Sequence, residues 1–189
     1  EKFALLAQHL WPGPLTIIGP VSPRIPPSIT AGLGTVGVRM PDHPVALGLI
    51  RHSGVPIAAP SANRSGRPSP TLASHVLEDL GGKVELILDG GPTGIGLEST
   101  VLDLVAPQPT VLRPGGVTIE ELEALLGPVD YISSIKPGER VRSPGLKYRH
   151  YSPQSKVCLV EGPATSVLAT METLVQEEKA AGMRVGVLA

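Results

Sequence analysis

The chain has 189 residues, of which 41% are hydrophobic and 17% are charged, and its formal net charge is −1. These values are typical of a globular protein of one domain or slightly more, and they exclude an intrinsically disordered chain. The near-neutral charge and the aromatic content of 3% argue against a nucleic-acid binder that depends on a basic surface or on base stacking.

The cysteine content and the hydropathy of the chain indicate in which cellular compartment we expect the protein. Cys158 is the single cysteine, so an internal disulfide is excluded, as is usual in a reducing cytosol. The sequence shows no signal peptide, and its apolar runs are far shorter than the roughly 18 residues of a membrane span. We therefore expect a cytoplasmic protein with no membrane partner.

Hydrophobic periodicity and turn residues predict short helices and strands along the whole chain. The helix at residues 1–10 has no N-cap before it, which leads us to expect that the natural chain extends further upstream. In chain order, the predicted elements are a helix at 1–10, a strand at 15–18, a proline- and glycine-rich loop at 20–34, a strand at 35–40, a helix at 42–52 capped by Asp42, a strand at 55–59, a helix at 70–80, strands at 84–88, 101–104 and 110–113, a helix at 118–126, and a strand, helix and strand at 157–160, 166–181 and 185–188.

The predicted strand at 35–40 carries polar residues on one face. Because side chains alternate along a strand, Thr35, Gly37 and Arg39 share a face, and Thr35 lies about 13 Å from Arg39 at roughly 3.3 Å per residue. Gly37 between them leaves room for a ligand. The alternative is an exposed edge strand with a solvated arginine.

Residues 55–71, VPIAAPSANRSGRPSPT, pass from an apolar run into a segment of hydroxyls, an amide and two guanidinium groups. Such groups bind phosphates and carboxylates. Ser69 followed by Pro70 resembles an N-cap with proline at the first helical position, and helix N-termini attract anions. The segment is therefore either an anion site or a surface loop rich in turn residues.

Two further strand ends carry polar groups. The glycine-rich loop at 89–96 has neither the P-loop nor the dinucleotide fingerprint, and Ser99 after it lacks the Gly-x-Ser-x-Gly context of a hydrolase nucleophile. Arg113 ends the strand at 110–113, a position where binding sites often lie, although a lone arginine is usually solvated. No histidine pair at i, i+4 lies near a carboxylate, so a metal site is not expected.

Residues 128–155 have the composition of a linker, rich in proline and glycine. Within it, residues 147–151, KYRHY, concentrate basic and aromatic side chains, which a spacer seldom needs; a membrane or RNA contact is conceivable for them. After the linker, the strand, helix and strand predict the beginning of a second α/β unit.

Six motifs occur in an order that resembles one known family. They are WPGPLT (11–16), TVGVRMPDHP (35–44), APSANRSGRPSPT (59–71), ESTV (98–101), LRPG (112–115) and SPGLKYRHYSP (143–153). Together they resemble the threonylcarbamoyl-AMP synthase family in its longer form. The resemblance implies an α/β fold: a YrdC-like twisted mixed sheet with flanking helices at 1–127, a linker or lid at 128–155, and the start of a C-terminal Rossmann-like domain at 156–189.

The resemblance also implies an activity. L-threonine and bicarbonate would form a carbamate that attacks the α-phosphorus of ATP, giving threonylcarbamoyl-AMP and pyrophosphate for the t6A modification of tRNA at position 37. Mg²⁺ would enter with the ATP, and downstream tRNA-modifying proteins would be partners. No side chain is assigned as catalytic, since such a displacement depends on positioning and charge neutralisation.

Site residues are carried over by matching motif. Arg39, as a bidentate fork for a carboxylate, is joined by Ser99 and the backbone of Ala59 at the threonine subsite. The residues implied to contact ATP are Thr35, Ser61, Asn63, Ser69, Arg113 and Tyr151.

The sequence departs from the family in one region, and two alternative functions remain open. The family's basic Lys-x-Arg region is missing from this sequence, so we expect the 189-residue chain to be weakly active or inactive. One alternative is a module that binds nucleic acid such as tRNA or double-stranded RNA. The other is a domain that binds a nucleotide or carbamoyl-adenylate without making it.

Overall fold

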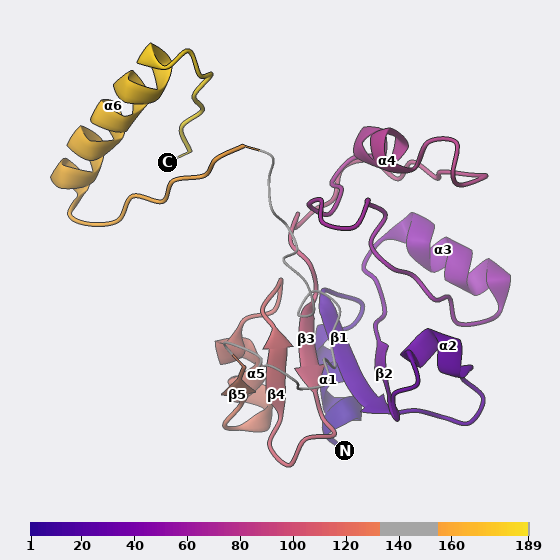
Figure 1. The fold of residues 1–189 in the computed structure, drawn as a ribbon. Coiled ribbons are helices and arrows are strands. Elements are labelled where there is room, and N and C mark those ends of the chain that lie inside the picture. The colour runs from indigo at the N-terminus through magenta and orange to yellow at the C-terminus, as the bar shows by residue number, and fades with distance from the viewer. Residues whose placement is uncertain (133–154, 189) are drawn as a thin grey trace. The chain divides into compact units, whose positions relative to one another are not determined.

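The computed structural model describes residues 1–132 and 155–188 (Figure 1). The chain divides into two compact units, residues 1–152 and 153–189. Unit 1 contains the helices and strands up to β5, and unit 2 contains α6. The bounds are α1 Lys2–Leu10, β1 Leu15–Pro20, α2 Pro27–Thr30, β2 Thr35–Val38, α3 Pro44–Ser53, α4 Ala73–Leu80, β3 Thr100–Asp103, β4 Thr110–Arg113, α5 Ile119–Leu126, β5 Asp130–Tyr131 and α6 Ala164–Ala180.

A five-stranded mixed sheet forms the centre of unit 1, with the order β2-β1-β3-β4-β5. β1 pairs antiparallel with β2 and parallel with β3, while β4 pairs antiparallel with β3 and parallel with β5. The expected α/β fold with a mixed sheet and flanking helices is therefore confirmed.

The larger of two hydrophobic clusters in the described residues lies on one face of this sheet. Leu15 and Ile17 of β1 point to that face and pack with Leu102 of β3, and Leu6 of α1 and Leu122 of α5 cover them. All five side chains are fully buried. Because side chains alternate, Thr16 between the two β1 residues faces the opposite side, where Ile18, Val101 and Leu112 form a second buried cluster.

Local sequence signals account for several elements. Thr118 Oγ1 accepts a hydrogen bond from the Glu121 N–H (3.2 Å), and the Glu121 carboxylate accepts one from the Thr118 N–H (2.8 Å). This is the predicted capping box at the start of α5, and it is confirmed. The helices at 1–10 and 166–181 and the strands at 15–18, 35–40, 101–104 and 110–113 are likewise present within a few residues.

Four predicted strands are wrong. Residues 55–59, 84–88, 157–160 and 185–188 have no ladder partner among the residues that the structure describes. Their apolar side chains remain exposed: Val55 by 60%, Leu86 by 72% and Leu188 by 97%. An apolar run shows that a segment suits a strand, but a strand forms only beside another strand that supplies hydrogen bonds.

Two predicted N-caps are also wrong. α3 begins at Pro44 with His43 as N-cap, not Asp42. α4 begins at Ala73 with Leu72 as N-cap, so Ser69 does not cap this helix. Prolines 68 and 70 favour extended backbone in the residues before them, which delays the first helical turn.

Two short elements lie where none was expected. α2 is a single turn within the loop predicted at 20–34. β5 lies in the predicted linker, where Asp130 and Tyr131 pair with Thr110 and Val111. A single helical turn and a strand of two residues are too short to show a hydrophobic period.

Unit 2 is described over residues 155–188. Its helix α6 is tied to the preceding segment by an ion pair between Lys156 and Glu178 (2.6 Å). Within the described ranges, no helix has both the length and the apolar character that crossing a bilayer requires.

Candidate functional site at one edge of the sheet

Four strands bring their ends to the same edge of the sheet. β1 and β3 are parallel and begin there, since Leu15 pairs with Thr100. β2 and β4 run the opposite way and end there, as the pairing of Val101 with Arg113 shows for β4. The residues just before β1 and β3 and at the ends of β2 and β4 therefore meet.

Hydroxyl groups and a guanidinium group form a connected cluster at this edge. Thr16 Oγ1 and Ser99 Oγ are 2.7 Å apart, within hydrogen-bond distance. The Arg113 Nη2 donates to the Ser99 carbonyl (2.9 Å) and to Ser99 Oγ (3.2 Å), and its Nε also donates to that carbonyl (3.2 Å). Ser99 is 5% exposed, so these bonds fix its position.

Arg39 brings a second guanidinium group to the cluster. Its Nε donates to the Gly13 carbonyl (3.0 Å), and the Gly13 N–H donates to the Met40 carbonyl (2.9 Å), which joins the end of β2 to the loop before β1. The pKa of Arg39 is lowered from its ordinary value, first by desolvation and then by the positive charge of Arg113. Two guanidinium groups thus act on each other at one point of the molecule.

The charge at this edge is not compensated within the described residues. Over 1–132 and 155–188, no carboxylate forms an ion pair with Arg39 or Arg113. An anion bound beside both groups would relieve their mutual repulsion, and guanidinium forks match the planar oxygens of carboxylates and phosphates. The arrangement is suited to bind an anionic ligand.

Gly37 keeps the polar face open beside this cluster. A Cβ atom at Gly37 would lie 3.1 Å from the Thr16 Cγ2 atom, closer than most such contacts in proteins. Glycine at this position therefore allows β2 and β1 to lie close together without a side chain covering the cluster.

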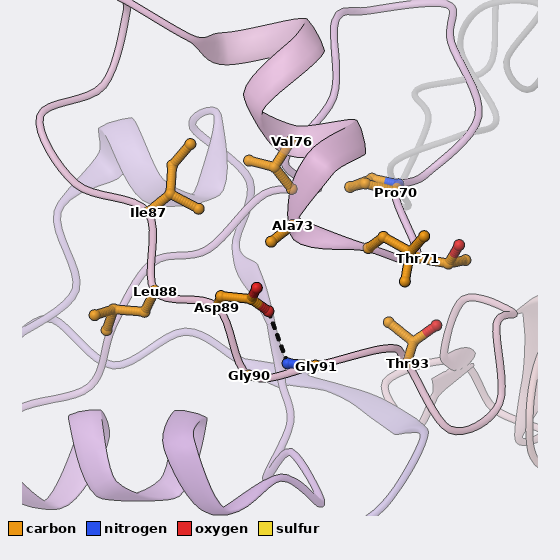
Figure 2. A pocket seen from close by; sticks show the side chains of 11 residues that line it. Pro70, Thr71, Ala73, Val76, Ile87, Leu88, Asp89, Gly90, Gly91 and Thr93 are labelled. Carbon is orange, nitrogen blue, oxygen red and sulfur yellow. Dashed lines mark hydrogen bonds between the residues drawn. The ribbon is translucent and has the colours of Figure 1, made fainter.

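Two hollows share part of their lining, and the first of them lies next to the cluster. The first, of about 80 Å³, is lined by residues that include Ser69, Thr93 and Glu98, and Glu98 directly precedes Ser99. The second, of about 150 Å³, lies between the N-terminal end of α4 and the glycine-rich loop (Figure 2). Pro70, Thr71 and Thr93 line both hollows.

Figure 2 shows how the second hollow is built. Asp89 Oδ1 accepts a hydrogen bond from the Gly91 N–H (2.8 Å), which fixes the turn of the glycine-rich loop. The side chains of Val76 and Ile87 form part of its apolar wall. The hollow therefore has an apolar wall on one side and the polar groups of Thr71, Asp89 and Thr93 in its lining.

The structure brings together three of the nine predicted site residues. Arg39, Ser99 and Arg113 belong to the cluster at the sheet edge. Thr35 lies at the other end of β2, where it pairs with Pro20. Ala59 and Ser61 are exposed in the segment that forms no strand.

The remaining three differ in their surroundings. Ser69 borders the first hollow, and its Oγ is buried without a hydrogen-bond partner among the described residues. Asn63 Oδ1 is buried in the same way. Tyr151 lies outside the described residues, so its assigned role stays a prediction, as do the ligand roles of the other eight.

Sequence reasoning missed two contributors to the cluster. Thr16 lies between two core residues of β1, and its polar side chain at that position could have indicated a functional face. The Gly13 carbonyl gave no signal of its own, because its bond to Arg39 depends on the fold. The described residues contain no group of three or more His, Cys, Asp or Glu that could hold a metal ion.

Two family models match the chain. One, described as telomere recombination and labelled Sua5/YciO/YrdC, matches residues 1–115. The other, described as the C-terminal domain of threonylcarbamoyl-AMP synthase, matches residues 117–189.

Individual relatives agree with these matches. A threonylcarbamoyl-AMP synthase of Bacillus subtilis is 51% identical over 190 residues, covering 100% of this chain and 54% of that protein. The crystal structure of P. abyssi Sua5 complexed with L-threonine superposes with a TM-score of 0.91 at 49% identity, covering 99% of this chain and 56% of the other. E. coli YciO gives a TM-score of 0.57 at 27% identity, covering 64% of this chain and 58% of its own. The chain spans about half the length of the curated relatives that it matches.

Proposed function

This chain belongs to the threonylcarbamoyl-AMP synthase family, and on that premise we propose that it serves the synthesis of threonylcarbamoyl-AMP from L-threonine, bicarbonate and ATP. The product would supply the t6A modification of tRNA at position 37. The observation that carries the proposal is the pair of guanidinium groups of Arg39 and Arg113 beside the hydroxyls of Thr16 and Ser99. No carboxylate within residues 1–132 and 155–188 forms an ion pair with either group.

L-threonine fits the Arg39 side of the cluster. The Nε of Arg39 is engaged by the Gly13 carbonyl, which orients the guanidinium plane and leaves its terminal nitrogens for a carboxylate. Ser99 and Thr16 offer hydroxyls for the polar groups of the amino acid. A relative whose structure was solved with L-threonine supports this choice of ligand.

The reaction requires little covalent chemistry from the protein. The threonine amine attacks bicarbonate and water leaves, giving a carbamate. A carbamate oxygen then attacks the α-phosphorus of ATP, and pyrophosphate leaves with the electron pair of the broken P–O bond. Bicarbonate, the carbamate and ATP are anionic, and L-threonine carries a carboxylate, so Arg39 and Arg113 would favour their approach by neutralising charge.

ATP would occupy the hollows beside the cluster. Ser69 borders the first hollow next to Glu98, and the glycine-rich loop allows close approach of backbone to ligand. Thr35, Ser61, Asn63 and Tyr151 are proposed as ATP contacts from their motifs alone. Mg²⁺ would bind the phosphates of ATP and enter as part of that substrate.

The proposal is tested by the reaction itself. With the purified chain, pyrophosphate release should require L-threonine and bicarbonate together, and equilibrium dialysis should show binding of labelled L-threonine that excess L-threonine displaces and D-threonine does not. Threonine binding is measured independently of turnover, so it tests the threonine subsite even where pyrophosphate release is slow. Pyrophosphate release at the same rate with and without threonine, or an absence of threonine binding, would contradict the proposal.

Replacing Arg113 by alanine is expected to weaken ATP binding about tenfold, because a charged hydrogen-bond donor near the phosphates contributes roughly 1.5 kcal/mol. Arg113→Lys should restore little of the ATP affinity. Lysine lacks the planar guanidinium that donates to both the carbonyl and the Oγ of Ser99. Titration with ATP by calorimetry measures both effects. Unchanged ATP affinity in folded Arg113→Ala would remove this residue from the nucleotide subsite.

A further inference from the structure

Asp79 of α4 ties the segment between Asn63 and Ser69 to the helix. Asp79 is 5% exposed, and its carboxylate faces that segment. Its Oδ2 accepts the Arg64 N–H (3.0 Å), and its Oδ1 accepts the Arg67 Nη1 (2.5 Å). The Arg64 Nε also donates to the Asp79 carbonyl (3.2 Å), so both arginines are tied to one residue.

The surroundings favour the charged form of this carboxylate. The pKa of Asp79 is lowered, first by the hydrogen bond from the Arg64 N–H and further by the Arg67 side chain, against the opposing effect of desolvation. Arg67 also pairs with Glu78 (3.0 Å), but the Glu78 side chain is 68% exposed. An exposed ion pair contributes little, whereas a buried carboxylate with several donors holds its partners firmly.

The held segment carries two buried polar atoms without partners. Asn63 Nδ2 donates to the carbonyls of Arg64 and Arg67, both at 2.9 Å, which fixes the amide and leaves Oδ1 unused. Asn63 Oδ1 and Ser69 Oγ are both buried, and neither forms a hydrogen bond with any residue that the structure describes. Buried polar atoms are nearly always paired, so two exceptions on one short segment indicate a place for a ligand.

We propose that Asp79 is a positioning residue that holds residues 63–69 in the conformation in which Asn63 Oδ1 and Ser69 Oγ bind the nucleotide substrate. The inference rests on the proposed function for the identity of the ligand. Asn63 Oδ1 accepts a hydrogen bond, so it suits an amino or hydroxyl group of the nucleoside, and Ser69 Oγ can donate or accept. Asp79 is assigned no ligand contact, because it is 5% exposed and both of its carboxylate oxygens face the segment.

The rate of trypsin cleavage measures how firmly residues 63–69 are held in place. Trypsin can cut the Arg64–Ser65 bond, whereas Arg67 is followed by proline and is resistant. In the native 189-residue chain, Asp79→Asn should raise the cleavage rate at Arg64–Ser65 about tenfold, since the charge that holds both arginines is lost. The new N-terminus at Ser65 is quantified by mass spectrometry against cleavage at Lys83–Val84. Glu78→Gln is the matched control and should change the rate less than twofold.

Ligand binding by the same variants tests positioning. Asp79→Asn should raise the Kd for ATP about tenfold and leave the Kd for L-threonine unchanged, because the threonine cluster lies on other elements. A residue that only stabilised the fold would alter both constants together. If Asp79→Asn does not fold, Arg67→Gln removes the contact between Arg67 and Asp79 by changing the segment instead of the helix. It should also raise the cleavage rate at Arg64–Ser65 and the Kd for ATP.

The outcomes separate this inference from the proposed function. Unchanged cleavage in a folded Asp79→Asn chain, or increased cleavage with an unchanged Kd for ATP, would overturn the positioning role. A wild-type chain that binds neither ATP nor L-threonine would instead contradict the proposed function and the nucleotide part of the inference. Increased cleavage in Asp79→Asn would still establish that Asp79 holds residues 63–69 against α4.

Discussion

Replacement of Arg39 by alanine is expected to raise the Kd for L-threonine about 100-fold, the result of losing roughly 3 kcal/mol from a bidentate, charge-assisted contact. The Nε bond to Gly13 fixes the guanidinium plane before the ligand binds, so little entropy is lost on binding. Stability should change little, because removal of one guanidinium also removes its repulsion of Arg113. Equilibrium dialysis with labelled L-threonine measures the affinity, and thermal unfolding measures the stability.

Two control variants show whether the effect is specific to this contact. Arg39→Lys keeps the charge but not the planar fork, so we expect about a tenfold loss. Arg51→Ala removes an exposed arginine in the last turn of α3 and should leave the affinity unchanged. If Arg39→Ala binds L-threonine as well as Arg51→Ala does, the carboxylate subsite is assigned to the wrong residue.

The part of the fold that local sequence determines was predicted well. The capping box at Thr118 and Glu121 is complete within four residues, and it marks the start of α5 correctly. The strand expected at 35–40 is present as β2 with Arg39 directly after it, and Arg113 ends β4 as expected. These patterns depend on neighbours along the chain, so they are visible in the sequence.

The features that were not predicted depend on contacts between residues distant in sequence. The run at 55–59 is as apolar as β1, yet it pairs with no strand in the described residues, and no local pattern reveals that. Thr16 meets Ser99 across 83 positions, and Asp79 meets Arg64 across 15. Thr35 shows the same limit: alternation gives the face it shares with Arg39 but not which end of the strand borders the site.

Gly115→Ala is expected to be the most damaging single substitution at the site. A Cβ atom there would lie 2.3 Å from the Glu98 carbonyl oxygen, 2.4 Å from the Thr100 nitrogen and 2.5 Å from the Ser99 carbonyl carbon. All three are backbone atoms, which cannot move aside as a flexible side chain could. We expect a loss of about 3 kcal/mol, at the upper end of overpacking effects, and a melting temperature lower by roughly 6–12 °C.

The same substitution should disturb binding more than stability alone explains. The three atoms that meet the new methyl group belong to the turn that carries Ser99, whose carbonyl and hydroxyl accept the bonds from Arg113. Below its melting temperature, Gly115→Ala should therefore still bind L-threonine at least tenfold more weakly than wild type, as expected when hydrogen bonds to a charged group are misplaced.

Gly94→Ala is the matched control, because a Cβ atom at Gly94 meets nothing within 4 Å. It lies in the nearby glycine-rich loop and should change the melting temperature by no more than about 2 °C, as is usual for a surface substitution. Equal melting temperatures for the two variants would show that the turn at Ser99 adapts to the extra methyl group. Such an adaptable turn could not hold Ser99 and Arg113 in the fixed geometry that an anion-binding cluster requires.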